Sequence, residues 1–210
     1  MNVQALLQGD DLSTLKVDTE CLALLGNPIM IADADLIIRY ANDSALSMFS
    51  EIEDDIRRDL PTFSATTVVG KSIDLFHKSP QKQRTVMRNL RSAHNGQFVI
   101  GGHTLAFRAA PKLSAKGDVE HFLVEWQDLT EVLKGKQQVS LLLKRTQEMA
   151  VAHAEGWINE FVQLDDFDEE YKGVARDINA MVTEHINTKK KIIACMEAFA
   201  SGDFAHPFPE

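Results

Sequence analysis

The spacing of apolar residues changes near residue 128, and this change most constrains what the chain can fold into. Before that point, short β-branched runs alternate with turn residues, which is typical of strands and hairpins. After it, apolar residues recur every three, four or seven positions, which is typical of long amphipathic helices. We therefore expect two parts of different architecture within the 210 residues.

The first part has the pattern of an antiparallel sheet with helices inserted between two hairpins. An Asp-rich turn at residues 33–35 and a Gly101-Gly102 turn each separate two apolar runs. Asn42-Asp43 offers an N-cap to the inserted segment, residues 43–95. The expected fold class is α+β, with an apolar pocket between sheet and insert. The predicted strands span residues 29–32, 36–41, 97–100, 104–109 and 121–126.

The second part has two narrow apolar stripes of the coiled-coil type, interrupted between Gly156 and Asp168. Helices with so narrow a stripe need a partner, and a second copy of the chain is the simplest one. We therefore expect a homodimer through the helical region. The first stripe comprises Val132, Val139, Leu142, Met149 and His153, and the second comprises Val174, Ile178, Met181, His185, Ile192, Cys195 and Phe199.

A short repeat marks the two expected helix ends. Residues 154–157, with Gly156, recur in part at residues 200–204, with Gly202. Glycine at this position is typical of a helix C-cap. The second copy stops where its connector would begin, so we expect the chain to be a fragment of a longer protein.

Composition argues against several classes of partner. The net charge is −9, from 31 acidic and 22 basic side chains, with no long basic run that could bind nucleic acid or an anionic membrane. No apolar run approaches the roughly 18 residues that span a bilayer, and the N-terminus lacks a signal-peptide pattern. Cys21 and Cys195 have no metal-type spacing, so we expect a cytoplasmic protein with free thiols.

Catalytic motifs are absent from the sequence, and we expect no enzyme activity in this chain. It has no P-loop, dinucleotide fingerprint, HExxH or GxSxG pattern. The paired carboxylates are expected to be solvated turn or helix-surface residues, because aspartate favours such positions. These pairs are Asp33/Asp35, Asp54/Asp55 and Asp165/Asp166.

His77 and Trp126 each have a structural and a functional interpretation. His77 lies among apolar residues in the insert, where it either packs in a short helix or supplies a single axial ligand to a haem iron. Trp126 alternates with Glu125 and Gln127, which places it on the inward face with Val124. It is either a core residue or the hydrogen-bond donor to a bound ligand.

Three segments resemble PAS domains in the order and spacing of that family. They are the run from Asn27 to Asn42, the Gly70-to-His77 segment, and residues 124–130, which end in an Asp-x-Thr exit. The resemblance covers about residues 25–130. It implies a sensor domain whose last strand leads directly into a signalling helix.

A narrower resemblance is to haem-binding PAS domains of soluble, aerotaxis-type chemoreceptors. The segment from Ile73 to Pro80 is similar to the one that carries their haem-ligating histidine, and their last strand carries a tryptophan. The resemblance implies haem b held by His77 and a diatomic gas, such as oxygen, stabilised by Trp126. It also implies a chemotaxis kinase complex as partner, through an output region beyond Glu210.

Residues 169–181 resemble the start of the second helix of HAMP signal relays, and residues 200–204 resemble the end of a first one. Lys172 occupies the usual glycine position, with Gly173 one residue later. The implied organisation is a helical lead at residues 1–26, a PAS domain at 27–130, a HAMP-like domain with its linker helix at 131–188, and the truncated start of a second unit at 189–210.

Two other functions remain open at this point. The PAS part could bind no cofactor and serve dimerisation and signal relay. It could also sense a small ligand other than haem. The insert offers no flavin-reactive cysteine, which disfavours a light sensor.

Overall fold

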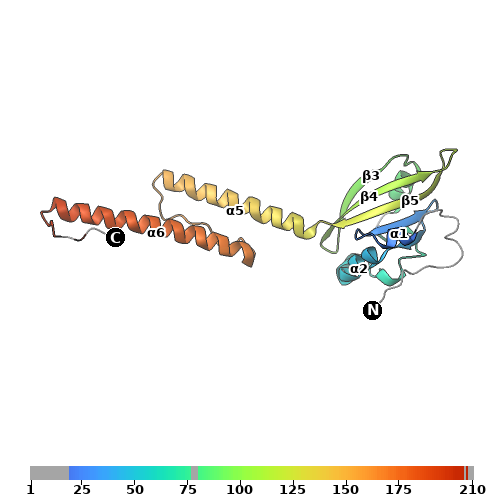
Figure 1. The fold of residues 1–210 in the computed structure, drawn as a ribbon, viewed down its shortest axis with the longest axis horizontal. Coiled ribbons are helices and arrows are strands. Elements are labelled where there is room, and N and C mark those ends of the chain that lie inside the picture. Colours follow the sequence, from blue (N-terminus) through green and yellow to red (C-terminus); the bar gives the residue numbers. More distant parts are fainter. Residues whose placement is uncertain (1–18, 77–79, 206, 208–210) are drawn as a thin grey trace. The chain divides into compact units, whose positions relative to one another are not determined.

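The computed structural model describes residues 19–76, 80–205 and 207. The chain divides into two compact units, Met1–Glu131 and Val132–Glu210. The first unit is built on a sheet, and the second consists mainly of two long helices (Figure 1). No helix in the described part of the chain combines the length and apolarity that a membrane span requires.

The sheet of the first unit confirms the predicted antiparallel architecture. Its strand order is β2-β1-β5-β4-β3, and every neighbouring pair is antiparallel. The second strand begins two residues later than predicted because Leu36 has a positive φ of 68° and belongs to the preceding turn. The strands are β1 (Ile29–Asp33), β2 (Ile38–Ala41), β3 (His94–Ile100), β4 (His103–Leu113) and β5 (Val119–Asp128).

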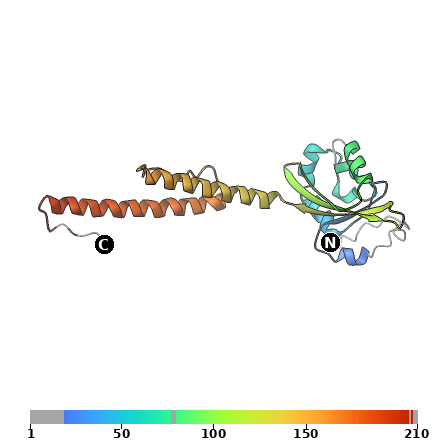
Figure 2. The ribbon, with the colours of Figure 1, turned by 90° about the horizontal axis from the view of Figure 1, so that it is seen from above.

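The inserted segment forms short helices that cover one face of the sheet, while α1 (Thr19–Ala23) lies on the other (Figure 2). Alternate strand residues point toward the insert and form the core with apolar side chains of the helices. The helices are α2 (Asp43–Glu51), α3 (Glu53–Asp59), the 3-10 turns η2 (Ala65–Thr67) and η3 (Ile73–Phe76), and α4 (Pro80–Arg88).

Asn42 ties the entrance of the sheet to the first inserted helix. Its side-chain oxygen accepts hydrogen bonds from the backbone N–H groups of Ile29 (2.9 Å) and Ala45 (3.0 Å), and the second of these is the predicted N-cap. Its amide nitrogen donates a hydrogen bond to the carbonyl of Asn27 at 2.8 Å. Asn42 is fully buried, so its hydrogen bonds fix the path of the chain into β1.

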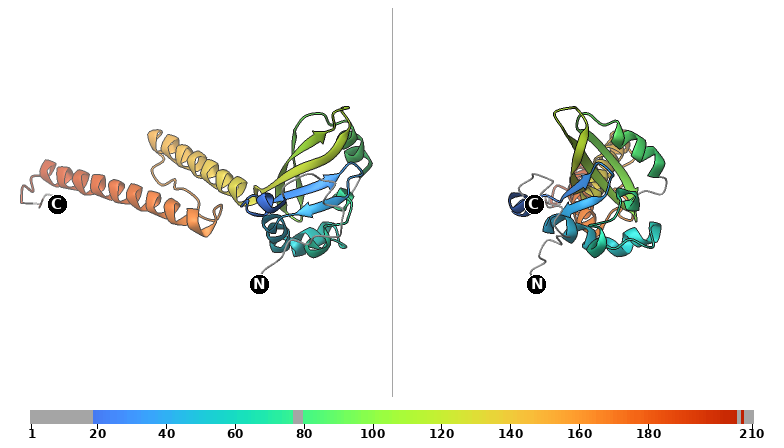
Figure 3. Two further views of the ribbon diagram at one scale, coloured as in Figure 1. Left: turned by 45° about the vertical axis from the view of Figure 1, so that its right-hand side comes forward. Right: turned by 90° about the vertical axis from the view of Figure 1, so that its right-hand side faces the viewer.

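The second unit confirms the two predicted long helices, α5 (Thr130–Ala154) and α6 (Glu169–Ala200). Both run in the same direction, because the connector between them returns along their length (Figures 1 and 3). A small apolar cluster joins the connector to the helices, with Met149, Val162, Phe167 and Ala175 buried in it.

Polar contacts hold the connector of the second unit in place. The Asn179 side chain accepts a hydrogen bond from the backbone N–H of Val162 (3.0 Å) and donates one to its carbonyl (2.9 Å).

Both helices end as predicted at glycines with positive φ, 98° at Gly156 and 92° at Gly202. After each glycine, the next N–H bonds back to the helix, as in a Schellman motif.

Candidate functional site

An apolar cavity of about 310 Å³ lies between the sheet and the insert of the first unit. Its size falls near the lower end of the roughly 300–1,000 Å³ typical of ligand pockets. The lining is mostly aromatic and aliphatic and comes from β1, η3, α4, β3, β4 and β5. The residues are Met30, Ile73, Phe76, Val86, Met87, His94, Gly96, Gln97, Phe98, Phe107, Ala109, Val124 and Trp126.

Trp126 lies at the centre of an aromatic cluster against this cavity. The centre of its ring system is 5.2 Å from that of Phe76, 5.5 Å from Phe49, 5.7 Å from Phe107 and 6.1 Å from Phe98. Such separations are typical of favourable aromatic contacts. Trp126 therefore occupies the predicted inward position, and only 6% of its surface is exposed.

The indole N–H of Trp126 has no hydrogen-bond partner among the described residues. A buried N–H without a partner costs about 1–3 kcal/mol, so such groups are rare and often belong to functional sites. The sheet contacts hold the ring in place, and the N–H remains available to a polar atom of a ligand.

His77, the predicted axial ligand, lies outside the described residues, but the flanks of its segment are placed. Phe76 directly precedes it and is 4% exposed, with its ring against Trp126. Asp74 and Arg84, on the two sides of residues 77–79, form an ion pair in which the Arg84 Nε donates to Asp74 at 2.9 Å. The ion pair raises the pKa of Arg84, and it fixes where the segment leaves and rejoins the fold.

His94 also lines the cavity, a place that its position in the sequence does not predict. It lies at the start of β3, and the centre of its ring is 6.1 Å from that of Phe107. Its place at the pocket follows from the pairing of β3 with β4, in which His94 lies opposite Ala109. Its sequence neighbours gave no such signal, because Ser92, Asn95 and Gly96 form no apolar run around it.

Gly96 leaves room for the tip of the Phe107 ring beside β3. A Cβ atom at residue 96 would come within 2.5 Å of the Phe107 ring, closer than real contacts allow. Phe107 is paired with Trp126 on β5. Gly96 therefore contributes to the position of the aromatic wall of the cavity.

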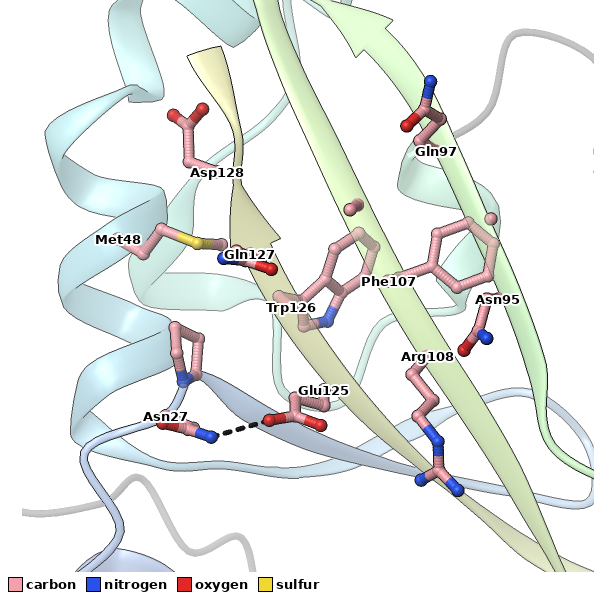
Figure 4. Close-up of a pocket in the computed structure, with 13 residues that line it drawn as sticks. Asn27, Met48, Asn95, Gln97, Phe107, Arg108, Glu125, Trp126, Gln127 and Asp128 are labelled. Carbon is pink, nitrogen blue, oxygen red and sulfur yellow. Dashed lines mark hydrogen bonds between the residues drawn. The ribbon is translucent and has the colours of Figure 1, made fainter. Parts of the chain in front are cut away.

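A second, more open cavity of about 800 Å³ shares Gly96, Gln97, Phe107 and Trp126 with the first (Figure 4). Polar and charged side chains dominate the rest of its lining. At one side Asn27 donates a hydrogen bond to Glu125 at 2.6 Å. Its polar lining suits water, so the 310 Å³ cavity is the better candidate for an apolar ligand.

A polar cluster at the edge of the second cavity, which Asp128 also lines, corrects one sequence expectation. Asp54 is exposed as predicted, but Asp55 is not merely solvated, since its carboxylate lies 3.0 Å from His103 Nε2. The other ring nitrogen, Nδ1, lies 2.9 Å from Asp128. Nothing in the spacing of these residues along the chain predicts the cluster. It forms where β4 pairs with β5 and where the turn between β3 and β4 lies against α3.

Comparison with known proteins identifies the first unit. The PAS domain family model matches residues 22–80. The methyl-accepting chemotaxis protein McpB of Pseudomonas aeruginosa is 31% identical over 175 residues, which cover 83% of this chain and 25% of that protein. The chain thus spans about a quarter of the length of this curated relative.

Solved structures of PAS domains resemble part of the chain. One belongs to the Aer2 receptor of Vibrio cholerae, described as a dual PAS-heme oxygen sensor. It is 28% identical, covers 50% of this chain and 95% of that one, and has a TM-score of 0.45. Another is the PAS domain of Bordetella pertussis BvgS, 17% identical, covering 63% and 98%, with a TM-score of 0.41. From the family match and the five-stranded antiparallel sheet with its inserted helices, the first unit of this chain is a PAS domain.

Proposed function

We propose that the PAS domain binds haem b in the 310 Å³ cavity, with His77 as axial ligand, and senses oxygen or another diatomic gas. The observation that carries the proposal is the buried, unpartnered N–H of Trp126 beside an apolar cavity. An apolar ligand alone would leave this donor unsatisfied, whereas a gas bound at the haem iron would offer it an acceptor.

The residues around the cavity are suited to this task. The apolar walls would exclude water from the ligand, and the rings of Phe76 and Phe107 hold Trp126 in a fixed orientation. Haem would supply an iron atom with an open position for a diatomic gas. Since the cavity is small, we expect the wall formed by Val86 and Met87 on α4 to move outward when haem binds.

The test is an absorption spectrum of the chain expressed with a supply of haem, for the wild type and for His77→Ala and His94→Ala. We expect a Soret band in the wild type and in His94→Ala, and its loss in His77→Ala. Trp126→Leu should keep the band and lose bound gas faster, because it removes the indole N–H that the described residues place at the cavity.

Two results would contradict this assignment. A well-folded wild type without a Soret band excludes haem. A band that survives in His77→Ala but disappears in His94→Ala would transfer the role of ligand to His94, which the structure places at the cavity.

The size of the cavity favours one alternative, a sensor of a smaller organic ligand with an acceptor for Trp126. Such a ligand would raise the melting temperature of the PAS domain without a Soret band. A PAS domain that binds neither would act only in dimerisation and signal relay.

For the whole protein, we propose a cytoplasmic chemoreceptor-type sensor that acts as a homodimer with HAMP-like helices. The parallel course of α5 and α6 and the similarity to a methyl-accepting chemotaxis protein support this. A shift of β5 caused by gas binding would be transmitted directly to α5, because the helix begins at Thr130, two residues after the end of the strand. The output would pass to a chemotaxis kinase complex.

A further inference from the structure

His103 connects separate elements of the PAS domain through the two nitrogen atoms of one ring. Its Nδ1 lies 2.9 Å from Asp128 at the end of β5, and its Nε2 lies 3.0 Å from Asp55 on α3. An ionised carboxylate accepts hydrogen bonds but cannot donate them. Both ring nitrogens must therefore carry a hydrogen, so this arrangement requires His103 to be a positively charged imidazolium.

The charged groups around the cluster are mainly acidic. From α3 they are Asp55, Arg58, which pairs with Asp55 at 2.8 Å, and Asp59, which accepts the Gly101 N–H at 2.8 Å. From β5 there is Asp128. Of these groups, the carboxylates of Asp55 and Asp128 contact the ring, so the local charge favours the imidazolium.

The cluster is also joined to the exit of the chain from the sheet. The other oxygen of Asp128 accepts a hydrogen bond from the backbone N–H of Thr130 at 2.8 Å and one from its hydroxyl. Thr104, the residue after His103, donates its N–H to that hydroxyl at 2.9 Å and accepts the Leu129 N–H at 2.8 Å. The residues that begin α5 are thus held by the strand that carries His103.

We propose that His103 is a proton-sensing latch between α3 and the start of α5, closed when the ring is protonated and open when it is neutral. A neutral imidazole has only one N–H, so it can keep its hydrogen bond to Asp55 or to Asp128 but not to both. The other carboxylate would then face a nitrogen lone pair and separate from it. The latch does not depend on haem or on any other ligand in the cavity.

The direction of the pH effect follows from the groups in contact. Burial alone lowers the pKa of His103, but the hydrogen bonds and charges of Asp55 and Asp128 outweigh it and raise the pKa above its usual value. A raised folded-state pKa means that the latch stabilises the fold fully below the unfolded pKa of about 6.5. This stabilisation is lost as pH rises through the higher folded-state pKa.

The test uses the whole chain and two NMR measurements over about pH 5.5 to 9, around the histidine range. The first follows the ring carbons of His103 to obtain its pKa. The second measures amide exchange at Thr130 and at residues 53–59, corrected for the intrinsic pH dependence of exchange. As His103 loses its proton, we expect protection to fall about tenfold or more on the side that loses its hydrogen bond to the charged ring. That side is Thr130 if the bond to Asp128 is lost, and residues 53–59 if the bond to Asp55 is lost.

Two variants make the result specific. In His103→Gln, which cannot become a cation, protection at Thr130 and at residues 53–59 should be independent of pH and equal to that of the wild type at high pH. In His121→Gln, which removes another histidine of the same sheet, the wild-type dependence should remain. An ordinary pKa for His103 in the wild type would overturn the proposal, as would protection that stays unchanged both at Thr130 and at residues 53–59 while His103 titrates.

Discussion

At the scale of single residues, Asn42 and Trp126 are both buried in the PAS core but differ in their hydrogen bonding. Both ends of the Asn42 side-chain amide form hydrogen bonds with the backbone. Besides the bonds described above, its amide nitrogen donates to the carbonyls of Leu22 and Leu25 at 3.3 Å. Trp126 leaves its N–H without a partner among the described residues. The first arrangement is typical of a structural residue, and the second is the observation on which the proposed ligand site depends.

Replacing Asn42 with Ala should destabilise the PAS domain by at least about 2 kcal/mol, because buried N–H groups of Ile29 and Ala45 lose their acceptor. Asn42→Asp keeps the acceptor and should lose less. Urea unfolding of the two variants beside wild type measures the difference. Equal losses of stability in the two variants would show that the hydrogen bonds donated by the Asn42 amide contribute more than those its oxygen accepts.

Trp126→Phe should cost the ligand-free PAS domain less than Trp126→Ala, for which core truncations predict about 3–5 kcal/mol. Phenylalanine keeps a ring among Phe76 and Phe107 and also removes the unpartnered N–H. Unfolding in urea compares the two variants. A Phe variant as unstable as the Ala variant would mean that the N–H has a partner in solution.

At the scale of elements, the turn between β3 and β4 is fitted closely to α3. Gly101 has a φ of 57°, and a Cβ there would lie 2.2 Å from the Asp55 carbonyl oxygen. Gly102 has a φ of 87° but open space around it. Both glycines are required by backbone conformation, but only Gly101 is also required by the contact between elements.

Gly102→Ala should therefore cost about 1–2 kcal/mol, the usual penalty of a left-handed conformation. Gly101→Ala should cost clearly more, because the methyl group would push the hairpin away from α3. It should also separate His103 from Asp55 and lower the pKa of His103. Urea unfolding measures the loss of stability, and an NMR titration measures the pKa of His103. Equal values of both quantities in the two variants would argue against a close contact between Gly101 and α3.

Elements differ in how far the sequence predicts them. The hairpins, the N-cap at Asn42 and both long helices follow from local patterns, because turn residues and periodicity act over a few positions. The lining of the cavity by His94 and the cluster around His103 do not follow from them. They depend on strand pairing between segments far apart in the chain, which local patterns do not encode.

At the scale of the whole molecule, the second unit keeps apolar side chains exposed after α5 and α6 have packed together. Leu143 is 67% exposed and Met181 66%, although both belong to helices with a buried cluster. The second apolar stripe of the sequence includes Met181, and we expect a second copy of the chain to cover this stripe. Nothing in a single chain tests that prediction.

Sedimentation equilibrium of the whole chain does test it. We expect a dimer whose dissociation constant rises at least about tenfold in Met181→Glu. The charge would replace an apolar side chain that the dimer interface is expected to bury. Glu184→Gln, at an exposed position one turn away, serves as control and should leave the dimer unchanged. A wild type that stays monomeric at high concentration would exclude the homodimer.

The two tryptophans of the sequence are divided between the two units, with consequences for observing the protein. Trp126 is 6% exposed beside the cavity, whereas Trp157, after the end of α5, is 67% exposed. Their fluorescence should therefore differ, with blue-shifted emission from the buried indole and red-shifted emission from the solvated one. A Trp157→Phe variant would turn the intrinsic fluorescence of the chain into a label-free signal from the sensor cavity alone.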